Sequence, residues 1–413
     1  MAKVSRLHLV LAVVLAFNTA CTRGTVDGEK LRWEVTRAGD TTVVTNYGEP
    51  ARLRSDSIRV VWQSWKLEFP TTLLPLGDRL IVGDANRIHI LSLEGEFLRT
   101  VGREGHGPGE FEFVVSLARF GTDTLAVHDA ENLRISFFTP DGDFLGLVPY
   151  VPLLPYGNPV NGYLLRISVR QGLVGLRGGV VSLWRERLNW TRPTRTVLVW
   201  HDLKADTAAV LESSWKGERW FRSRRLGATV QLFEPQVIAA LAPDGRFAVG
   251  NGIEYCITVH VVMQGGFRRI CRDRTPAPVG AGIRNPDLRW LRPSSRRRCA
   301  IRVKEQEISK YLPHFDRMLF DDEGRLWVRT LGEELSNVHP CLLEERDRYL
   351  LEGAPEFRPP FRTWDVFDEL GRFFTTIEIP SNLDPHAIQS GRMYGFVELP
   401  TGEVAVGVVT VAL

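Results

Sequence analysis

Two segments of the chain repeat one pattern of strands and turns, and this repeat limits the possible folds more than any other feature. Residues 80–98 read LIVGDANRIHILSLEGEFL, and residues 125–145 read LAVHDAENLRISFFTPDGDFL. The shared positions are Leu80, Val82, Asp84 and Ile90, which recur as Leu125, Val127, Asp129 and Ile135. A repeat of ~45 residues in which apolar strands alternate with tight turns is typical of one four-stranded propeller blade. The sequence therefore predicts an all-β fold, a β-propeller.

Strand and turn patterns elsewhere extend this repeat into six predicted blades. A third blade is expected over 163–211, a fourth over 241–273, where strands alternate with Asp-Gly and Gly-Gly turns, and a fifth that is split between 318–331 and 363–380. The C-terminal segment 395–413 is expected to pair with strands near the N-terminus, so that the ring closes without an exposed edge. Because ~45 residues per blade would give more than six blades, a Pro- and Arg-rich insertion is predicted at about 275–314. Seven blades remain an alternative.

The N-terminal segment 1–20 is predicted to be a signal peptide and is left out of the fold. Lys3 and Arg6 precede an apolar run that is too short to span a bilayer. The Asn-Thr-Ala-Cys that follows resembles the lipobox of bacterial lipoproteins, in which cleavage leaves the cysteine, here Cys21, as an acylated N-terminus. Residues 21–30 are then a tether, and residues 31–413 the propeller. The alternative is ordinary secretion with a free Cys21.

Charge excludes one class of partner and points to one candidate surface. The formal net charge is +3 at pH 7, and two of the cations belong to the signal peptide. Nucleic-acid binding, which needs a strongly basic surface, is therefore not predicted. One cluster without intervening acids stands out as a candidate binding site for an anion or a partner: Arg289, Arg292, Arg296, Arg297, Arg298 and Arg302.

The five cysteines allow a disulfide but no recognisable metal site. With Cys21 acylated, four cysteines remain, and these permit three pairings. Cys256 and Cys271 flank a Gly-Gly turn, which places them on neighbouring strands at nearly opposed positions and makes them the possible disulfide. Free buried thiols are the alternative. No Cys-x-x-Cys and no paired histidines occur, so neither a metal nor another cofactor is predicted.

Two motifs invite a chemical interpretation and also have a structural one. The glycine-rich GREGHGPGEF, residues 102–111, lacks the helix start and the Lys-Ser or Lys-Thr of a phosphate-binding loop, so a connection between blades is favoured. Asp84 and Asp129 recur in the repeat, which favours hydrogen bonding to turn backbone over a calcium site or catalysis. No catalytic residue is predicted.

The repeat and the glycine-rich motif together resemble a known family. Gly77 to Asp84, Asn86-Arg87-Ile88, Glu94-Gly95-Glu96-Phe97 and Gly102 to Phe111 follow the pattern of the NHL-like six-bladed β-propeller lipoproteins of bacteria. The later segments 322–328 and 364–367 are similar to the C-terminal blades of that family. The resemblance covers about a quarter of the chain and implies a fold and an exported location, but no activity.

These observations lead to two hypotheses about function. The first is a non-enzymatic, lipid-anchored scaffold at the cell envelope that binds a protein, a peptide or a glycan through loops held on a rigid ring. Its contact with the membrane is the N-terminal lipid. The second is a hydrolase or lyase that uses a metal in the central channel, a site that separate blades can assemble without any sequence motif.

Overall fold

The computed structural model describes the chain between residues 21 and 413, with gaps. The described residues are 21–26, 31–49, 52–55, 57–64, 67–121, 123–149, 167–176, 179–186, 195–202, 207–214, 220–221, 229–230, 238–242, 244–261, 267–279, 310–332 and 360–413. Over these residues the secondary structure is β-strand, and no helix occurs. The predicted all-β class is confirmed.

In the described part of the chain, six sheets of four or more strands form the blades, and blades 1 to 5 each have four strands in chain order from the inside outward. Blade 1 contains β6 (Pro70–Leu76), β7 (Arg79–Asp84), β8 (Arg87–Ser92) and β9 (Phe97–Val101). Blade 2 contains β10 (Val114–Phe120), β11 (Thr124–Asp129), β12 (Arg134–Phe138) and β13 (Phe144–Pro149). Blade 3 contains β14 (Ile167–Leu176), β15 (Gly179–Glu186), β16 (Arg195–Asp202) and β17 (Thr207–Ser214).

The remaining blades come from the second half of the chain. Blade 4 contains β20 (Ile238–Leu241), β21 (Arg246–Gly250), β22 (Cys256–Val261) and β23 (Phe267–Arg272). Blade 5 contains β24 (Phe315–Phe320), β25 (Leu326–Thr330), β26 (Phe361–Phe367) and β27 (Phe373–Pro380), with β4 (Arg52–Arg54) outside β27. Blade 6 contains β28 (Leu383–Gln389), β29 (Arg392–Glu398), β30 (Val404–Thr410) and β5 (Arg59–Trp62). A separate pair joins β18 (Trp220–Phe221) to β19 (Thr229–Val230).

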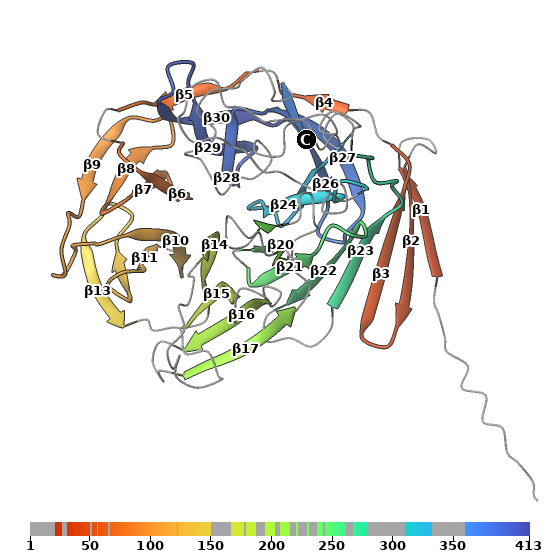
Figure 1. Cartoon of the computed structure of the whole chain (residues 1–413), viewed down its shortest axis with the longest axis horizontal. Coiled ribbons are helices and arrows are strands. Elements are labelled where there is room, and N and C mark those ends of the chain that lie inside the picture. Colours follow the sequence, from red (N-terminus) through yellow and green to blue (C-terminus); the bar gives the residue numbers. More distant parts are fainter. Residues whose placement is uncertain are drawn as a thin grey trace, which may run out of the picture.

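The blades stand around a common axis, as Figure 1 shows. The innermost strands contact one another in a closed cycle of β6, β10, β14, β20, β24 and β28, after which β28 contacts β6 again. A closed cycle of sheets is a β-propeller, because each sheet buries both faces against its neighbours and the ring leaves no open end. The predicted fold class is confirmed, and the cycle favours six blades over seven.

The hydrophobic core lies between adjacent blades, which explains why the repeated strands are buried along their whole length. Leu80, Ile81 and Val82 are consecutive in β7 and all have 0% exposure, because one face of the sheet packs on blade 2 and the other on blade 6. Similar clusters join blades 4 and 5 and blades 5 and 6. A sheet that is buried on both faces needs apolar residues at consecutive positions. The repeat therefore contains continuous apolar runs in addition to strands in which apolar and polar residues alternate.

A strand from near the N-terminus closes the ring by pairing with the C-terminal strands, as the sequence predicts. β5 pairs antiparallel with β30, so that Val60 lies opposite Gly407 and Trp62 opposite Val406. Blade 6 therefore takes three strands from the C-terminal segment and its outermost strand from residues near the N-terminus. This pairing satisfies the outer edge of β30, which would otherwise carry unpaired backbone groups.

Three further N-terminal strands extend blade 4 rather than blade 6. β1 (Cys21–Val26) pairs with β2 (Leu31–Ala38), β2 pairs with β3 (Thr41–Tyr47), and β3 runs parallel to β23. The prediction of a tether over residues 21–30 thus differs from the structure at Cys21–Val26, whereas residues 27–30 lie outside the described part. The sequence there is small and polar, but its threonines and valine suit a strand, and pairing satisfies the edge of β2.

The outer strands of blade 4 are joined by the disulfide that the sequence suggests. Cys256 and Cys271 are directly opposed in β22 and β23, and their sulfur atoms are bonded with a Cα–Cα distance of 4.1 Å. The bond closes a short loop, with a sequence separation of 15. In the chain-entropy model, closing a loop of that length stabilises the folded state by about 3 kcal/mol.

Replacing both Cys256 and Cys271 by serine should therefore lower the free energy of unfolding by about 3 kcal/mol. Urea denaturation of the oxidised protein measures this difference. As a control, a reductant should destabilise the natural protein by a similar amount and leave the double serine variant unchanged. Equal stability of the two proteins under oxidising conditions would contradict the bond.

Candidate functional site

The two faces of the ring differ in how the strands are connected. The tight-turn face carries the described turns between the first and second strands of a blade and, where these are consecutive in the chain, between its third and fourth strands. Examples are 77–78, 93–96, 139–143 and 368–372. Here ion pairs cross from blade to blade: Arg79 Nε lies 2.9 Å from Asp141 of blade 2, and Arg392 Nη1 lies 2.6 Å from Glu94 of blade 1.

The opposite, long-connection face carries the segments that lead from one blade to the next and those between second and third strands. The longest of these are 150–166, 215–237, 273–314 and 331–360. On this face, a recurring backbone hydrogen bond joins the residue after a blade's second strand to the residue before its first strand. Ala130 N donates to Phe113 O at 3.0 Å in blade 2, and Leu331 N donates to His314 O at 3.1 Å in blade 5. The strands that flank these long segments thus all end or begin on one face of the ring.

The repeated aspartates have a structural role, as the sequence favours. Asp84 and Asp129 both end a second strand, and both have 0% exposure. Asp84 accepts hydrogen bonds from the backbone N–H groups of Glu68 and Phe69. Asp129 accepts the equivalent bonds from Glu112 and Phe113, each at 3.0 Å. Each carboxylate therefore fixes the start of its blade's innermost strand and is unavailable for catalysis at the surface.

The glycine-rich segment 102–111 is a connection between blades, and side chains of the segment and of blade 2 satisfy its backbone hydrogen bonds. Arg134 of β12 donates to the carbonyl oxygens of His106, Gly107 and Glu110 at 2.6, 2.9 and 2.7 Å. The Glu110 carboxylate accepts from Gly107 N at 2.8 Å, and this bond, followed by Arg103, lowers the pKa of Glu110. The loop binds a cation through its carbonyl groups, which is the opposite of a phosphate-binding loop.

The predicted insertion is the connection 273–314 between β23 and β24, and its two ends form a short paired neck. Val279 N donates to Lys310 O at 3.0 Å, and Leu312 N donates to Ala277 O at 2.8 Å. Ala277, Val279 and Leu312 are buried, so the neck is packed onto the ring. The predicted arginine cluster lies between these ends and outside the described residues: Arg289, Arg292, Arg296, Arg297, Arg298 and Arg302.

A buried polar junction lies where this connection leaves blade 4. Arg272, the last residue of β23, forms an ion pair with Asp365 of blade 5, and its guanidinium lies 4.0 Å from the centre of the Phe373 ring. Asp365 also accepts from the Tyr255 hydroxyl at 2.5 Å and from the Thr376 hydroxyl at 2.9 Å. Burial, followed by the charge of Asp365, raises the pKa of Tyr255 well above its ordinary value. The junction joins two blades at the root of the insertion.

His314 lies at the other end of the connection, beside this junction. Its ring centroid is 5.7 Å from that of Tyr255, and the residue is 6% exposed. Its Nδ1 atom has no hydrogen-bond partner among the residues the structure describes. Burial, followed by the charge of Arg274, lowers the pKa of His314 from 6.5 to about 4. The imidazole is therefore neutral at physiological pH.

This depressed pKa predicts a loss of stability in mild acid. In the unfolded chain His314 takes up a proton near pH 6.5, whereas in the folded chain it does so only near pH 4. Folding stability is thus fully present above pH 6.5 and falls between pH 6.5 and 4, by at most about 3 kcal/mol. Urea unfolding of the natural protein and of His314→Phe at several pH values should show a difference that is constant above pH 6.5 and changes below it. A constant difference down to pH 4 would contradict the assignment.

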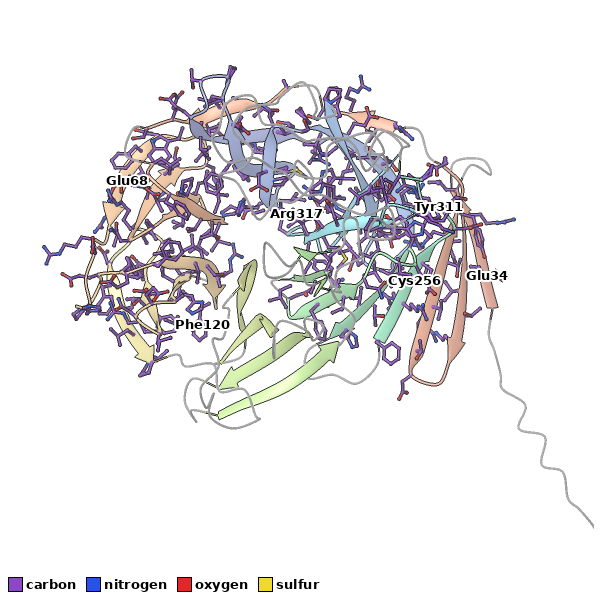
Figure 2. All side chains as sticks on the ribbon, in the orientation of Figure 1. Glu34, Glu68, Phe120, Cys256, Tyr311 and Arg317 are labelled. Carbon is purple, nitrogen blue, oxygen red and sulfur yellow. A yellow bond between two sulfur atoms is a disulfide. The ribbon has the colours of Figure 1, made fainter. Side chains whose placement is uncertain are left out.

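Near the axis, the innermost strands of blades 5 and 6 are linked by an arginine. Arg317 of β24, labelled in Figure 2, donates to the Asp384 carboxylate and to the Pro385 carbonyl oxygen of β28. Within the described ranges, no group of three or more His, Cys, Asp or Glu side chains is arranged to hold a metal ion. No described helix is long and apolar enough to cross a membrane.

The junction was not predicted from the sequence, because its members come from distant segments. Tyr255, Arg272 and Asp365 have no mutual spacing that a local pattern could reveal, and His314 carries no motif. One feature of the sequence could have indicated the junction: Arg272 and His314 border the insertion. If these residues are buried there, they must be neutral or paired with an opposite charge.

Comparisons with known proteins support no family assignment. No family model matches the chain, and no curated protein sequence matches it. Among solved structures, a DUF4221 family member from Bacteroides vulgatus is 9% identical, with a TM-score of 0.48, over 86% of this chain and 98% of that chain. A gluconolactonase from Xanthomonas campestris is 11% identical, with a TM-score of 0.41, over 86% and 89%. Virginiamycin B lyase from Staphylococcus aureus is 11% identical, with a TM-score of 0.38, over 85% and 87%.

These similarities are too distant to carry an argument about activity, and the β-propeller assignment depends on this chain's own cycle of sheets. Membership of the NHL-like lipoproteins stays a prediction.

Proposed function

We propose that the protein is an exported, lipid-anchored β-propeller that binds a protein, peptide or glycan at the cell envelope without catalysing a reaction. The anchor is Cys21, and the binding surface is the long-connection face. The observation that carries this proposal is the unequal length of the connections on the two faces.

Long segments on a rigid ring suit recognition. The backbone bond from Leu331 N to His314 O fixes the described ends of connections 273–314 and 331–360 before a partner arrives. A preorganised scaffold loses less conformational entropy on binding than a flexible one, and binding residues concentrate in loops on such scaffolds. The opposite face, with short turns and paired charges, offers little comparable surface.

The composition of connection 273–314 gives the chemistry of the partner. Its arginine cluster contains six cations between residues 289 and 302 with no acid among them. Arginine binds carboxylates and phosphates through paired hydrogen bonds, so an anionic glycan or an acidic protein surface is the expected partner. The Cys256–Cys271 bond suits an oxidising, extracytoplasmic compartment.

The test is a pull-down from envelope extract with the full acylated chain. Replacing Arg296, Arg297 and Arg298 together by glutamine should abolish capture of a partner that the natural protein retains at low salt and releases at high salt. The matched control replaces three exposed arginines outside this face, Arg52, Arg54 and Arg99, and should retain the partner.

Two outcomes would overturn the proposal. If both triple variants capture the same partner as the natural protein, the arginine cluster does not bind it. If metal analysis of the purified protein finds a stoichiometric divalent ion together with hydrolase or lyase activity, the channel hypothesis replaces the scaffold.

A further inference from the structure

The position of Cys21 in the sheet fixes the direction from which the chain enters the fold. Cys21 pairs with Thr36, Thr36 pairs with Val43, and Val43 pairs with Arg269 of β23. Cys21 therefore lies level with the middle of the outermost strand of blade 4, at the outer edge of the extended sheet in Figure 1.

The direction of β1 follows from the same pairings. β3 is parallel to β23, β2 is antiparallel to β3, and β1 is antiparallel to β2, so β1 runs in the direction of β23. β23 runs from the tight-turn face to the long-connection face, because connection 273–314 follows it. The start of β1, at Cys21, thus points toward the tight-turn face.

The hairpin between β2 and β3 extends further in the same direction. Its turn contains Gly39, with φ 59°, and Asp40, whose carbonyl oxygen accepts from Phe267 N at 3.3 Å. This turn lies three residues beyond the Thr36 level, or about 10 Å at the rise of a β-strand. Both Gly39 and Asp40 are exposed.

We propose that acylation at Cys21 holds the propeller with its tight-turn face and the Gly39-Asp40 turn toward the bilayer, so that the long-connection face points away from it. This inference rests on the proposed anchor. A free tether of ten residues would span about 17 Å and allow any orientation. Because Cys21 is itself a paired strand residue, the lipid is attached without such a tether. The occupant of the tight-turn face is therefore a lipid surface, and the binding face stays accessible.

The orientation can be measured with a fluorescent label placed on either face of the full acylated chain. In a background with Cys299 and Cys341 replaced by serine, one variant carries Asp40→Cys and a matched variant carries Glu131→Cys. Both residues are exposed, and Glu131 lies between β11 and β12 on the long-connection face. Each is labelled with an environment-sensitive dye and bound to phosphatidylethanolamine and phosphatidylglycerol vesicles that contain a headgroup-nitroxide lipid.

We expect strong loss of fluorescence at position 40 and none at position 131. In acylated, vesicle-bound protein, equal quenching at both positions, or quenching at 131 alone, would overturn the orientation and leave the anchor intact. Mass spectrometry of the N-terminal peptide tests the anchor separately. If Cys21 carries no acyl mass, and the protein binds vesicles no better than Cys21→Ser, the anchor and the orientation both fail.

Discussion

Replacing Asp365 by alanine should lower the free energy of unfolding by about 3–5 kcal/mol, because it leaves the buried Arg272 guanidinium without its main counter-ion. Arg272 is 6% exposed and Asp365 is 1% exposed, and the counter-ion that remains, Glu49 at 2.9 Å from Arg272 Nη2, is itself exposed to solvent and compensates less. The Tyr255 and Thr376 hydroxyls lose their acceptor at the same time. Urea denaturation at neutral pH measures the effect.

A double variant separates the cost of an unpaired charge from the cost of lost packing. Arg272→Met combined with Asp365→Leu removes both charges and should recover part of the stability that Asp365→Ala loses. The matched control is Glu369→Ala, an exposed residue of the same blade, which should change stability by less than about 0.5 kcal/mol. A loss at Asp365 no larger than that at Glu369 would show that the junction does not hold blades 4 and 5 together.

Local sequence patterns predict the blades well because each blade is built from local pairings. The strands of blades 1 and 2 are consecutive in the chain, and their turns carry glycines with positive φ at Gly95 and Gly142. A Cβ atom at Gly95 would lie 2.0 Å from the Val61 carbonyl oxygen, so the repeated glycine is required by packing as well as by the turn.

Pairings between distant segments could not be predicted in the same way. β3 pairs in parallel with β23, so that Val44 lies opposite Ile270 although the two residues are far apart in the chain. No turn residue in the sequence indicates a pairing of this kind. The sequence shows that 31–47 contains strands, but both blade 4 and blade 6 could accept them. The choice depends on which outer edge remains open, and β5 already covers that of blade 6.

The sequence also cannot place the candidate binding residues relative to the fold. The arginine cluster is visible as composition and lies outside the described residues, whereas the described ends of connection 273–314 are placed on one face by the alternation of strand directions through the blades. The buried junction at its root depends on side chains from β23 and β26 and from the segment before β22. Composition identifies candidate residues, whereas topology decides which of them lie together.

Trp62 should be the residue on which closure of the ring depends most. It lies in β5, is 9% exposed, and packs between blade 1 and blade 6 with Leu80, Val82 and Val406. Its ring centroid is 5.1 Å from that of His89. Trp62→Ala should lower the free energy of unfolding by about 3–5 kcal/mol, because it leaves a large cavity between blade 1 and blade 6, where the ring closes.

The effect at Trp62 should also be local in a way that hydrogen exchange can detect. When β5 loses its anchor, the amide groups of β30 that pair with it become accessible by partial opening, so exchange in Val404–Thr410 should accelerate more than exchange in blade 2. Val60→Ala is the matched control, because Val60 lies on the same strand with 41% exposure and should change stability by less than about 0.5 kcal/mol. If Trp62→Ala and Val60→Ala destabilise the protein equally, or if exchange rises uniformly in all blades, then β5 does not act as the closing strand. If β5 does close the ring, Trp62→Ala destabilises the protein more than Val60→Ala, and exchange rises most in β30. In the described part of the chain, β30 is the only strand that pairs with residues 59–62.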